Sequence, residues 1–236
     1  MDPDRRSGSA QPHSASAATC SFGYADAFGA DSLTTMSLPE RNVSALVVAA
    51  YDPAWQHRGA ALTAELKTLL GPLALRVEHI GSTAIPGMAA KPVFDMQISV
   101  DDLDAAATAF DEPLATAFGL TRRPYEQDHI PAGRNDPPHR WAKRLWTKPA
   151  PGGERIIVHC RIADSPNERL ALLFRDWFRS HPQAVPAYAR FKQKLAVAVG
   201  ELEAYTDVKD PVVDLVTTAA EEWATAADWP AQGVDR

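Results

Sequence analysis

The sequence predicts an α+β protein in which a mixed, twisted β-sheet is flanked by helices and the C-terminal helices close one side of a cleft. Apolar segments of strand length alternate with helical patterns over most of the chain, whereas the last third is helical, and no internal repeat is found. The 236 residues, 45% of them apolar and 23% charged, suffice for one sizeable core.

Composition divides the chain into three parts. Residues 1–38 are rich in Ser, Ala, Gly and Asp and lack the apolar run of a secretory signal, so we expect a disordered tail that is dispensable for folding. Residues 39–228 carry the periodic patterns and are expected to form the folded domain. Residues 229–236 are expected to form a short C-terminal tail.

Charge and cysteine content exclude several classes of protein. The 24 Lys and Arg against 30 Asp and Glu give a net charge of −6, which argues against binding nucleic acid through overall positive charge. No apolar run approaches the roughly 18 residues of a membrane span, so no membrane partner is expected. Two cysteines, Cys20 and Cys160, form neither a disulfide framework nor a metal-binding spacing, which favours the cytoplasm. Nothing in the sequence indicates the oligomeric state.

The first half of the chain predicts strands around one helix. A buried strand is expected over 44–51, and a helix is expected from Asp52 and Pro53 to about Leu70, with Leu69 on its buried face. Further strands are expected over 75–80 and 93–100.

The strand over 93–100 has two different faces. Asp95 and Gln97 lie on one face, and the apolar residues between them lie on the other. A hairpin is expected from 139–148 and 154–163, and His159 and Arg161 share one face of its second strand.

The last third predicts three helices. Ser165 and Glu168 fit a capping box at the start of the first helix, which ends before His181. A second helix is expected after Pro186, and a third from Asp210 to about 227.

A glycine-rich turn is the most informative segment. The strand over 75–80 runs into Gly81, Ser82 and Thr83, where backbone N–H groups and a small hydroxyl can hold a phosphate. Asp95 on the next strand can hold the divalent ion that a phosphate brings. On spacing alone, a tight structural turn with a surface aspartate is the more common explanation.

The segment 77–95 resembles the signature of the GrpB family, whose members are placed by fold in the DNA polymerase β-like nucleotidyltransferase superfamily. The resemblance covers roughly residues 42–220 and implies a nucleotidyltransferase-like sheet. Further similar motifs lie at 51–55, 139–143, 159–161, 165–167, 174–179, 188–192 and 205–209.

The chain departs from the superfamily at its acidic positions. Working nucleotidyltransferases of this fold resemble one another in carrying two carboxylates on one strand and a third on a neighbouring strand, which together hold two ions. Here the second position is Gln97, a weaker neutral ligand, and the hairpin offers His159 and Arg161, which suit phosphate or carboxylate. The site therefore either uses one magnesium ion with basic side chains, or binds a ligand without transferring anything.

The resemblance implies an enzyme that transfers a nucleotidyl or phosphoryl group from a nucleoside triphosphate, with ATP the expected nucleotide, to a small-molecule acceptor. A variant within this class is a ligase that activates an acceptor carboxylate. The alternative is a non-catalytic nucleotide-binding or accessory domain, since GrpB-like domains resembling this one occur fused to dephospho-CoA kinase. The expected catalytic residues are Asp95, His159, Arg161 and Lys91, the nucleotide-binding residues Gly81, Ser82, Thr83, Arg140, Lys143, Arg175 and Lys192, and the metal ligands Asp95 and Gln97.

Structural explanations compete with several of these roles. Lys91 can be a solvated loop lysine, and Arg140 and Lys143 can be charges that protect an edge strand. Arg175 can lie on a solvated helix face or form ion pairs within the chain. Binding of nucleic acid through 122–123 or 140–144 is a weak third possibility at this net charge.

Overall fold

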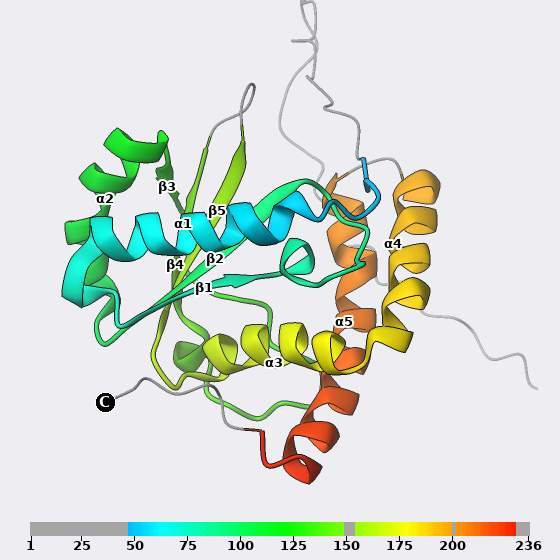
Figure 1. Ribbon diagram of the computed structural model, residues 1–236. Coiled ribbons are helices and arrows are strands. Elements are labelled where there is room, and N and C mark those ends of the chain that lie inside the picture. The colour runs from blue at the N-terminus through cyan, green and yellow to red at the C-terminus, as the bar shows by residue number, and fades with distance from the viewer. Residues whose placement is uncertain (1–46, 149–153, 200–201, 230–236) are drawn as a thin grey trace, which may run out of the picture. The chain divides into compact units, whose positions relative to one another are not determined.

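The computed structural model describes residues 47–148, 154–199 and 202–229, all within one compact unit (Figure 1). The tail expected over 1–38, the hairpin turn at 149–153 and residues 230–236 lie outside the described residues. Where the strand over 44–51 was expected, the described part forms only an isolated bridge between Ala49 and Ala90.

The expected mixed sheet is confirmed. It has five strands in the order β1-β2-β5-β4-β3, of which β2 and β5 run parallel and the other neighbours antiparallel. The strands are β1 (Arg76–Ile80), β2 (Val93–Val100), β3 (Thr121–Arg123), β4 (Lys143–Thr147) and β5 (Arg155–Ile162).

The pairing of β4 with β5 confirms the expected hairpin, but the first strand is shorter than expected. Pro138–Trp141 forms a 3-10 turn (η3) instead of strand. Pro137 and Pro138 explain the difference because a proline has no N–H to donate to a strand ladder.

One face of the sheet is apolar and is covered by α1 (Ala54–Leu70) and α2 (Leu103–Phe118). Phe94 and Met96 of β2 pack there, as expected, with Leu66 of α1. Leu69 was expected to be buried but is 37% exposed, because the buried positions of α1 continue from Leu66 to Leu70.

Helix α2 was not predicted, although its ends carry recognisable signals. The Asp102 carboxylate accepts hydrogen bonds from the backbone N–H groups of Asp104 and Ala105, and Gly119 ends the helix in the left-handed conformation.

Helices from the last third of the chain lie on the other side of the sheet, and the first of them packs on its second face. These are α3 (Pro166–Ser180), α4 (Val185–Val199) and α5 (Leu202–Ala226), and α3 contacts β1, β5 and α5 (Figure 1). The predicted start of a helix at Asp210 is wrong, since α5 passes through Pro211. A proline removes only one helical hydrogen bond, and the buried residues Tyr205 and Ala220 anchor the helix on both sides of it.

The expected capping box is also wrong. The Ser165 hydroxyl donates to Asn167 Oδ1 instead of capping the helix. The Glu168 carboxylate is fully buried, where it accepts hydrogen bonds from Arg76 and from the Ser99 hydroxyl. The residues that fit a capping box in the sequence therefore include one partner of a buried ion pair between α3 and the sheet.

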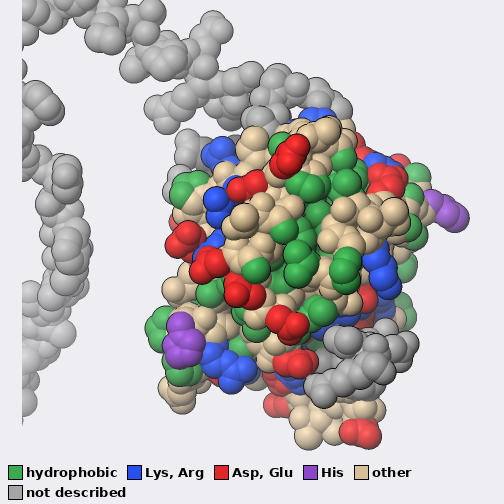
Figure 2. Space-filling view, turned by 90° about the vertical axis from the view of Figure 1, so that its left-hand side faces the viewer, with side chains coloured by type: hydrophobic (Ala, Val, Ile, Leu, Met, Phe, Trp, Pro, Cys, Tyr) green, Lys and Arg blue, Asp and Glu red, His purple; other side chains and the backbone are tan. Residues whose placement is uncertain are grey.

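On the left-hand side of the molecule as seen in Figure 1, acidic and basic side chains are interspersed around apolar ones (Figure 2). Among the described helices, none has both the length and the apolarity that crossing a bilayer requires.

Candidate functional site

Two adjoining cavities lie where the ends of β1, β2 and β5 meet the C-terminal helices. Their volumes are about 310 and 330 Å³, and both are lined by Ser82, Asp95 and Lys209. We call the smaller one the lysine pocket. It is also lined by Thr83, Lys91, Val93, Arg155, Ile157, Lys192, Tyr205 and Thr206. We call the larger one the chamber, and its wall includes His159, Trp141, Phe174, Asp210 and Thr217.

The turn after β1 places Gly81 against the Asp95 carboxylate, in a backbone conformation that glycine adopts more readily than other residues. Gly81 has φ 71° and ψ −169°, a region that other residues rarely adopt. A Cβ atom at this position would lie 2.4 Å from Asp95 Oδ2. The next residue, Ser82, accepts a hydrogen bond of 2.8 Å from Lys192 Nζ of α4. The glycine turn, β2 and α4 therefore converge on one point, as the sequence predicted.

Thr83 stabilises this turn from inside. Its hydroxyl donates to the Val93 carbonyl at 2.9 Å, so it must accept its second hydrogen bond, also 2.9 Å, from His79 Nε2. Burial lowers the pKa of His79 to about 4, which keeps the ring neutral. Because the Thr83 hydroxyl is used internally and the side chain is buried, the hydroxyl has a structural role, and only the backbone of Thr83 remains for the expected contact with nucleotide.

Three lysines gather around the lysine pocket, together with Arg155. Lys91 Nζ lies over the ring of Tyr205, 4.8 Å from its centroid. Burial lowers the pKa of Lys91 to about 8 and that of Lys192 to about 7, and the charge of Lys209 acts in the same direction on both. Lys209 was not among the expected site residues, although the motif at 205–209 contains it. The pocket concentrates cations that repel one another, which is the arrangement that an anion stabilises.

Asp95 and His159 face each other at the boundary of the two cavities. His159 Nε2 lies 3.5 Å from Asp95 Oδ1, and the carboxylate is 29% exposed. Burial favours a higher pKa for Asp95, but the interaction with His159 and the charges of Lys209 and Lys91 outweigh it and lower the pKa. Burial also lowers the pKa of His159, despite the opposing effect of Asp95. The pair therefore consists of an ionised carboxylate and a neutral imidazole.

Gln97 does not act as the expected metal ligand. Its Oε1 accepts a 2.5 Å hydrogen bond from Arg161 Nη1, and its Nε2 donates to the Glu168 carbonyl at 3.2 Å. The side chain is fully buried, so its amide joins β2 to β5 and α3 instead of facing a ligand.

Asp128 is a second charged residue, besides Lys209, that sequence reasoning missed. Arg161 donates to both of its carboxylate oxygens, Lys143 Nζ lies 2.7 Å from Oδ1, and Asn167 Nδ2 donates to Oδ2. Arg161 outweighs the effect of burial and lowers the pKa of Asp128. Arg161 and Lys143 thus share the single negative charge of Asp128 and anchor the loop before β4, which gives both of them a structural role.

Two further expected nucleotide-binding residues line neither cavity. Arg140 is exposed and donates to the Asp164 carbonyl. Arg175 is buried, pairs with Glu78 at 2.6 Å and Asp176 at 2.7 Å, and donates to the His79 carbonyl. Its alternative explanation as an intrachain ion pair is the one that the structure supports.

The donor set limits how a metal ion can be held. Among the described residues, no group of three or more His, Cys, Asp and Glu side chains is arranged to hold a metal ion. Asp95 alone fits magnesium only when phosphate oxygens and water molecules complete the coordination, as is common for this ion.

The fold and the site together define the class of protein. It is an α+β protein whose glycine turn and aspartate-bearing strand face a cluster of lysines. A crystal structure of GrpB from Enterococcus faecalis matches it with a TM-score of 0.56 and 26% identity, covering 75% of this chain and 99% of that one. The GrpB protein family matches residues 45–219. The chain therefore belongs to the GrpB family.

Curated relatives have two kinds of name. A dephospho-CoA kinase of Mycolicibacterium paratuberculosis is 36% identical over 196 residues, which are 75% of this chain and 46% of that protein. A UPF0157 protein of Halalkalibacterium halodurans is 31% identical over 80% of this chain and 88% of its own length. The chain thus spans about half the length of the kinases that it matches.

Proposed function

We propose that the lysine pocket binds the phosphates of a nucleoside triphosphate, with ATP the expected nucleotide, and that the protein transfers a nucleotidyl or phosphoryl group to a small-molecule acceptor. The observation that carries this proposal is the convergence of Lys91, Lys192 and Lys209 on the Gly81-Ser82 turn. Lysines beside a turn with a small hydroxyl suit a polyphosphate, because each ammonium neutralises charge and donates hydrogen bonds.

Each residue has a distinct role in this proposal. The lysines hold the phosphates, and Asp95 would hold a magnesium ion that arrives with them and adds charge stabilisation. His159 lies at the boundary with the chamber, where a proton from the acceptor can be taken up. Arg161 positions Asp128 and Gln97, which revises its expected catalytic role.

A second candidate is a nucleotide-binding domain without catalysis. The observation that favours it is Gln97, whose amide occupies the position of the second acid and is used in structural hydrogen bonds. The dephospho-CoA kinases among the relatives are longer proteins, which is compatible with an accessory role for the matching part.

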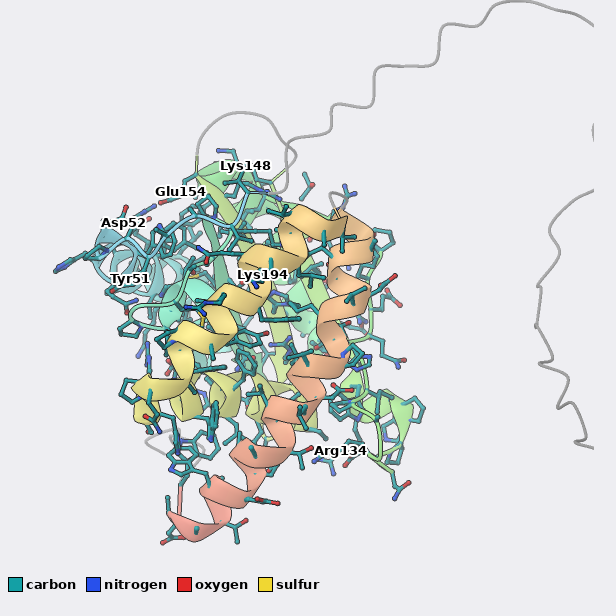
Figure 3. All side chains as sticks on the ribbon, turned by 90° about the vertical axis from the view of Figure 1, so that its right-hand side faces the viewer. Tyr51, Asp52, Arg134, Lys148, Glu154 and Lys194 are labelled. Atoms are coloured by element: carbon teal, nitrogen blue, oxygen red, sulfur yellow. The ribbon has the colours of Figure 1, made fainter. Side chains whose placement is uncertain are left out.

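Calorimetric titration with ATP, with and without magnesium, tests nucleotide binding. Lys192→Gln should weaken binding by about tenfold or more, because a charge-assisted contact is lost. Lys194→Gln is the matched control, since Lys194 lies on the exposed side of the same helix (Figure 3). Asp95→Asn should remove the magnesium dependence. Equal binding by the wild type and both Lys192 and Asp95 variants would overturn the proposal.

Release of pyrophosphate or of nucleoside diphosphate separates the two candidates. An enzyme incubated with ATP and a metabolite mixture should release one of these products, and the release should be lost in Asp95→Asn. Binding of ATP with no release above that of the variant would favour the non-catalytic domain.

A further inference from the structure

We infer that the chamber is the acceptor site and that it takes a small molecule with an apolar body and a neutral hydroxyl or an amine, and not a free carboxylate. The inference rests on the proposed function for the transfer itself, whereas the binding site and the ligand class rest on the chamber alone.

Unpaired polar atoms mark the chamber as a site for a polar ligand. Among the residues that the structure describes, the buried side-chain atoms with no hydrogen-bond partner are Trp141 Nε1, His159 Nδ1 and Thr217 Oγ1. All three residues line the chamber, and they come from η3, β5 and α5. Trp141 is fully buried and Thr217 is 6% exposed. Buried polar groups normally find a partner, so a ligand that reaches these three atoms from the chamber would satisfy groups that the protein leaves unpaired.

The hydrogen-bonding types of these atoms define what the ligand must carry. The indole N–H of Trp141 can only donate, so the ligand needs an acceptor atom. His159 Nε2 faces the Asp95 carboxylate and must carry its proton there, which leaves Nδ1 as an acceptor. The ligand therefore also needs an N–H or O–H donor. A hydroxyl supplies both the acceptor and the donor, a protonated amine supplies the donor alone, and an ionised carboxylate has no donor.

The charges around the chamber favour the same class. Its lining includes four aspartates, whereas the cations among the described lining residues are Arg161 and Lys209. Asp128 is paired with Arg161, and Asp214 accepts from the Ala132 N–H and lies 3.2 Å from His129. Asp210 forms no ion pair with another described residue, so its carboxylate is available to attract an amine and repel a carboxylate.

The rest of the chamber wall is apolar, so the part of the ligand that lies against it should be apolar as well. Leu170, Phe174 and Val213 line it together with the Trp141 ring. A volume of about 330 Å³ lies in the range of small-molecule sites. A molecule with a single ring and a short chain fits both the volume and the wall.

Three probes with the same ring and different end groups test the ligand class: phenethyl alcohol, phenethylamine and hydrocinnamate. Saturation-transfer NMR with the full chain should detect the alcohol and the amine, and hydrocinnamate should bind about tenfold more weakly, because it leaves His159 Nδ1 unpaired and meets Asp210. Hydrocinnamate binding as well as the amine, or no binding of any probe, would overturn the inference.

Single substitutions test whether the probes bind in the chamber. Thr217→Val removes the hydroxyl at nearly constant shape and should weaken binding of the alcohol several-fold. Thr218→Val is the control, because Thr218 is exposed on the same helix and its hydroxyl donates to the Asp214 carbonyl. Asp210→Asn should reduce the preference for the amine over the alcohol. Equal effects of the two threonine variants would contradict the assignment.

An ATP titration of the same sample separates the two proposals. Binding of the amine and alcohol without any binding of ATP would leave the chamber assignment standing and remove the proposed function. Binding of ATP without any of the probes would do the reverse.

Discussion

The Asp95 carboxylate packs against a residue that has no side chain, and this contact can be tested directly. Gly81→Ala should unfold more easily, because the new methyl group would lie 2.4 Å from Asp95 Oδ2 and because φ is 71°. We expect a loss of about 1–3 kcal/mol from backbone strain and a further loss of about 1–3 kcal/mol from overpacking. Urea denaturation measures both.

Gly71 provides the matched control for this prediction. Its φ of 63° and ψ of −153° are similar to those of Gly81, but a Cβ there would meet nothing within 4 Å. Gly71→Ala should therefore show the strain without the overpacking and leave ATP binding unchanged. Equal losses in the two variants would mean that the contact with Asp95 contributes nothing.

The lysine pocket should take up protons when it binds an anion. At pH 8 the Lys91 ammonium, whose pKa is about 8, and Lys192, whose pKa is about 7, are only partly protonated. A bound triphosphate raises both pKa values, so protons enter, and affinity should fall as the pH rises through this range. The phosphate groups titrate near pH 6 and contribute little.

Calorimetry in buffers of different ionisation enthalpy measures this uptake. The wild type and Lys194→Gln should show it equally, and Lys192→Gln should show less. Release of protons at pH 8 would contradict the arrangement of buried lysines.

At the scale of elements, α3 is fixed to the sheet by a buried charge. Glu168 of α3 accepts hydrogen bonds from Arg76 of β1 and Ser99 of β2, and both charged side chains are less than 10% exposed. Glu168→Gln should lower the free energy of unfolding by about 3–5 kcal/mol, because Arg76 loses its counter-charge in a buried position.

A partly buried pair between α3 and α5 serves as the comparison. Arg169 of α3 and Glu221 of α5 lie 2.5 Å apart and are 36% and 30% exposed. Glu221→Gln should cost about 0–1 kcal/mol, since water screens such pairs. Thermal and urea unfolding of both variants would show whether burial makes the difference.

Elements with a clear local period could be predicted from the sequence, whereas roles that depend on distant contacts could not. β2 begins and ends as predicted because its apolar and polar residues alternate. Helix α2 was not predicted because its many alanines obscure the helical spacing of its larger apolar residues. Asp128 and Gln97 could not be assigned, because their partner Arg161 lies on a strand more than 30 residues away.

At the scale of the whole molecule, a ligand in the lysine pocket would join three parts of the chain. Lys192 lies on α4, Lys209 on α5, and Asp95 on β2. Saturating inorganic tripolyphosphate, at about 100 times its dissociation constant, should add about 2.7 kcal/mol of stability, which raises Tm by roughly 5–10 °C. Differential scanning calorimetry measures the shift. A Tm unchanged at millimolar tripolyphosphate would count against an anion site.

The sequence also predicted the fold class of the whole molecule better than its site. The order of strands and helices and the family resemblance both indicated a mixed sheet with helices, and the structure confirms it. Of the expected phosphate-binding side chains, Ser82, Lys91 and Lys192 meet in the lysine pocket. Lys143 and Arg175 serve ion pairs instead, because a sequence motif does not show which acid a base will meet.

The two faces of the sheet impose different rules on how relatives of this protein can diverge. On the apolar face, Met96 or Ile98 can be exchanged for a residue of similar volume without a second change. On the other face, Arg76 depends on Glu168 and Arg161 on Asp128, so a change in one leaves a buried charge unbalanced. Divergence should therefore proceed one position at a time on the first face and as correlated pairs on the second.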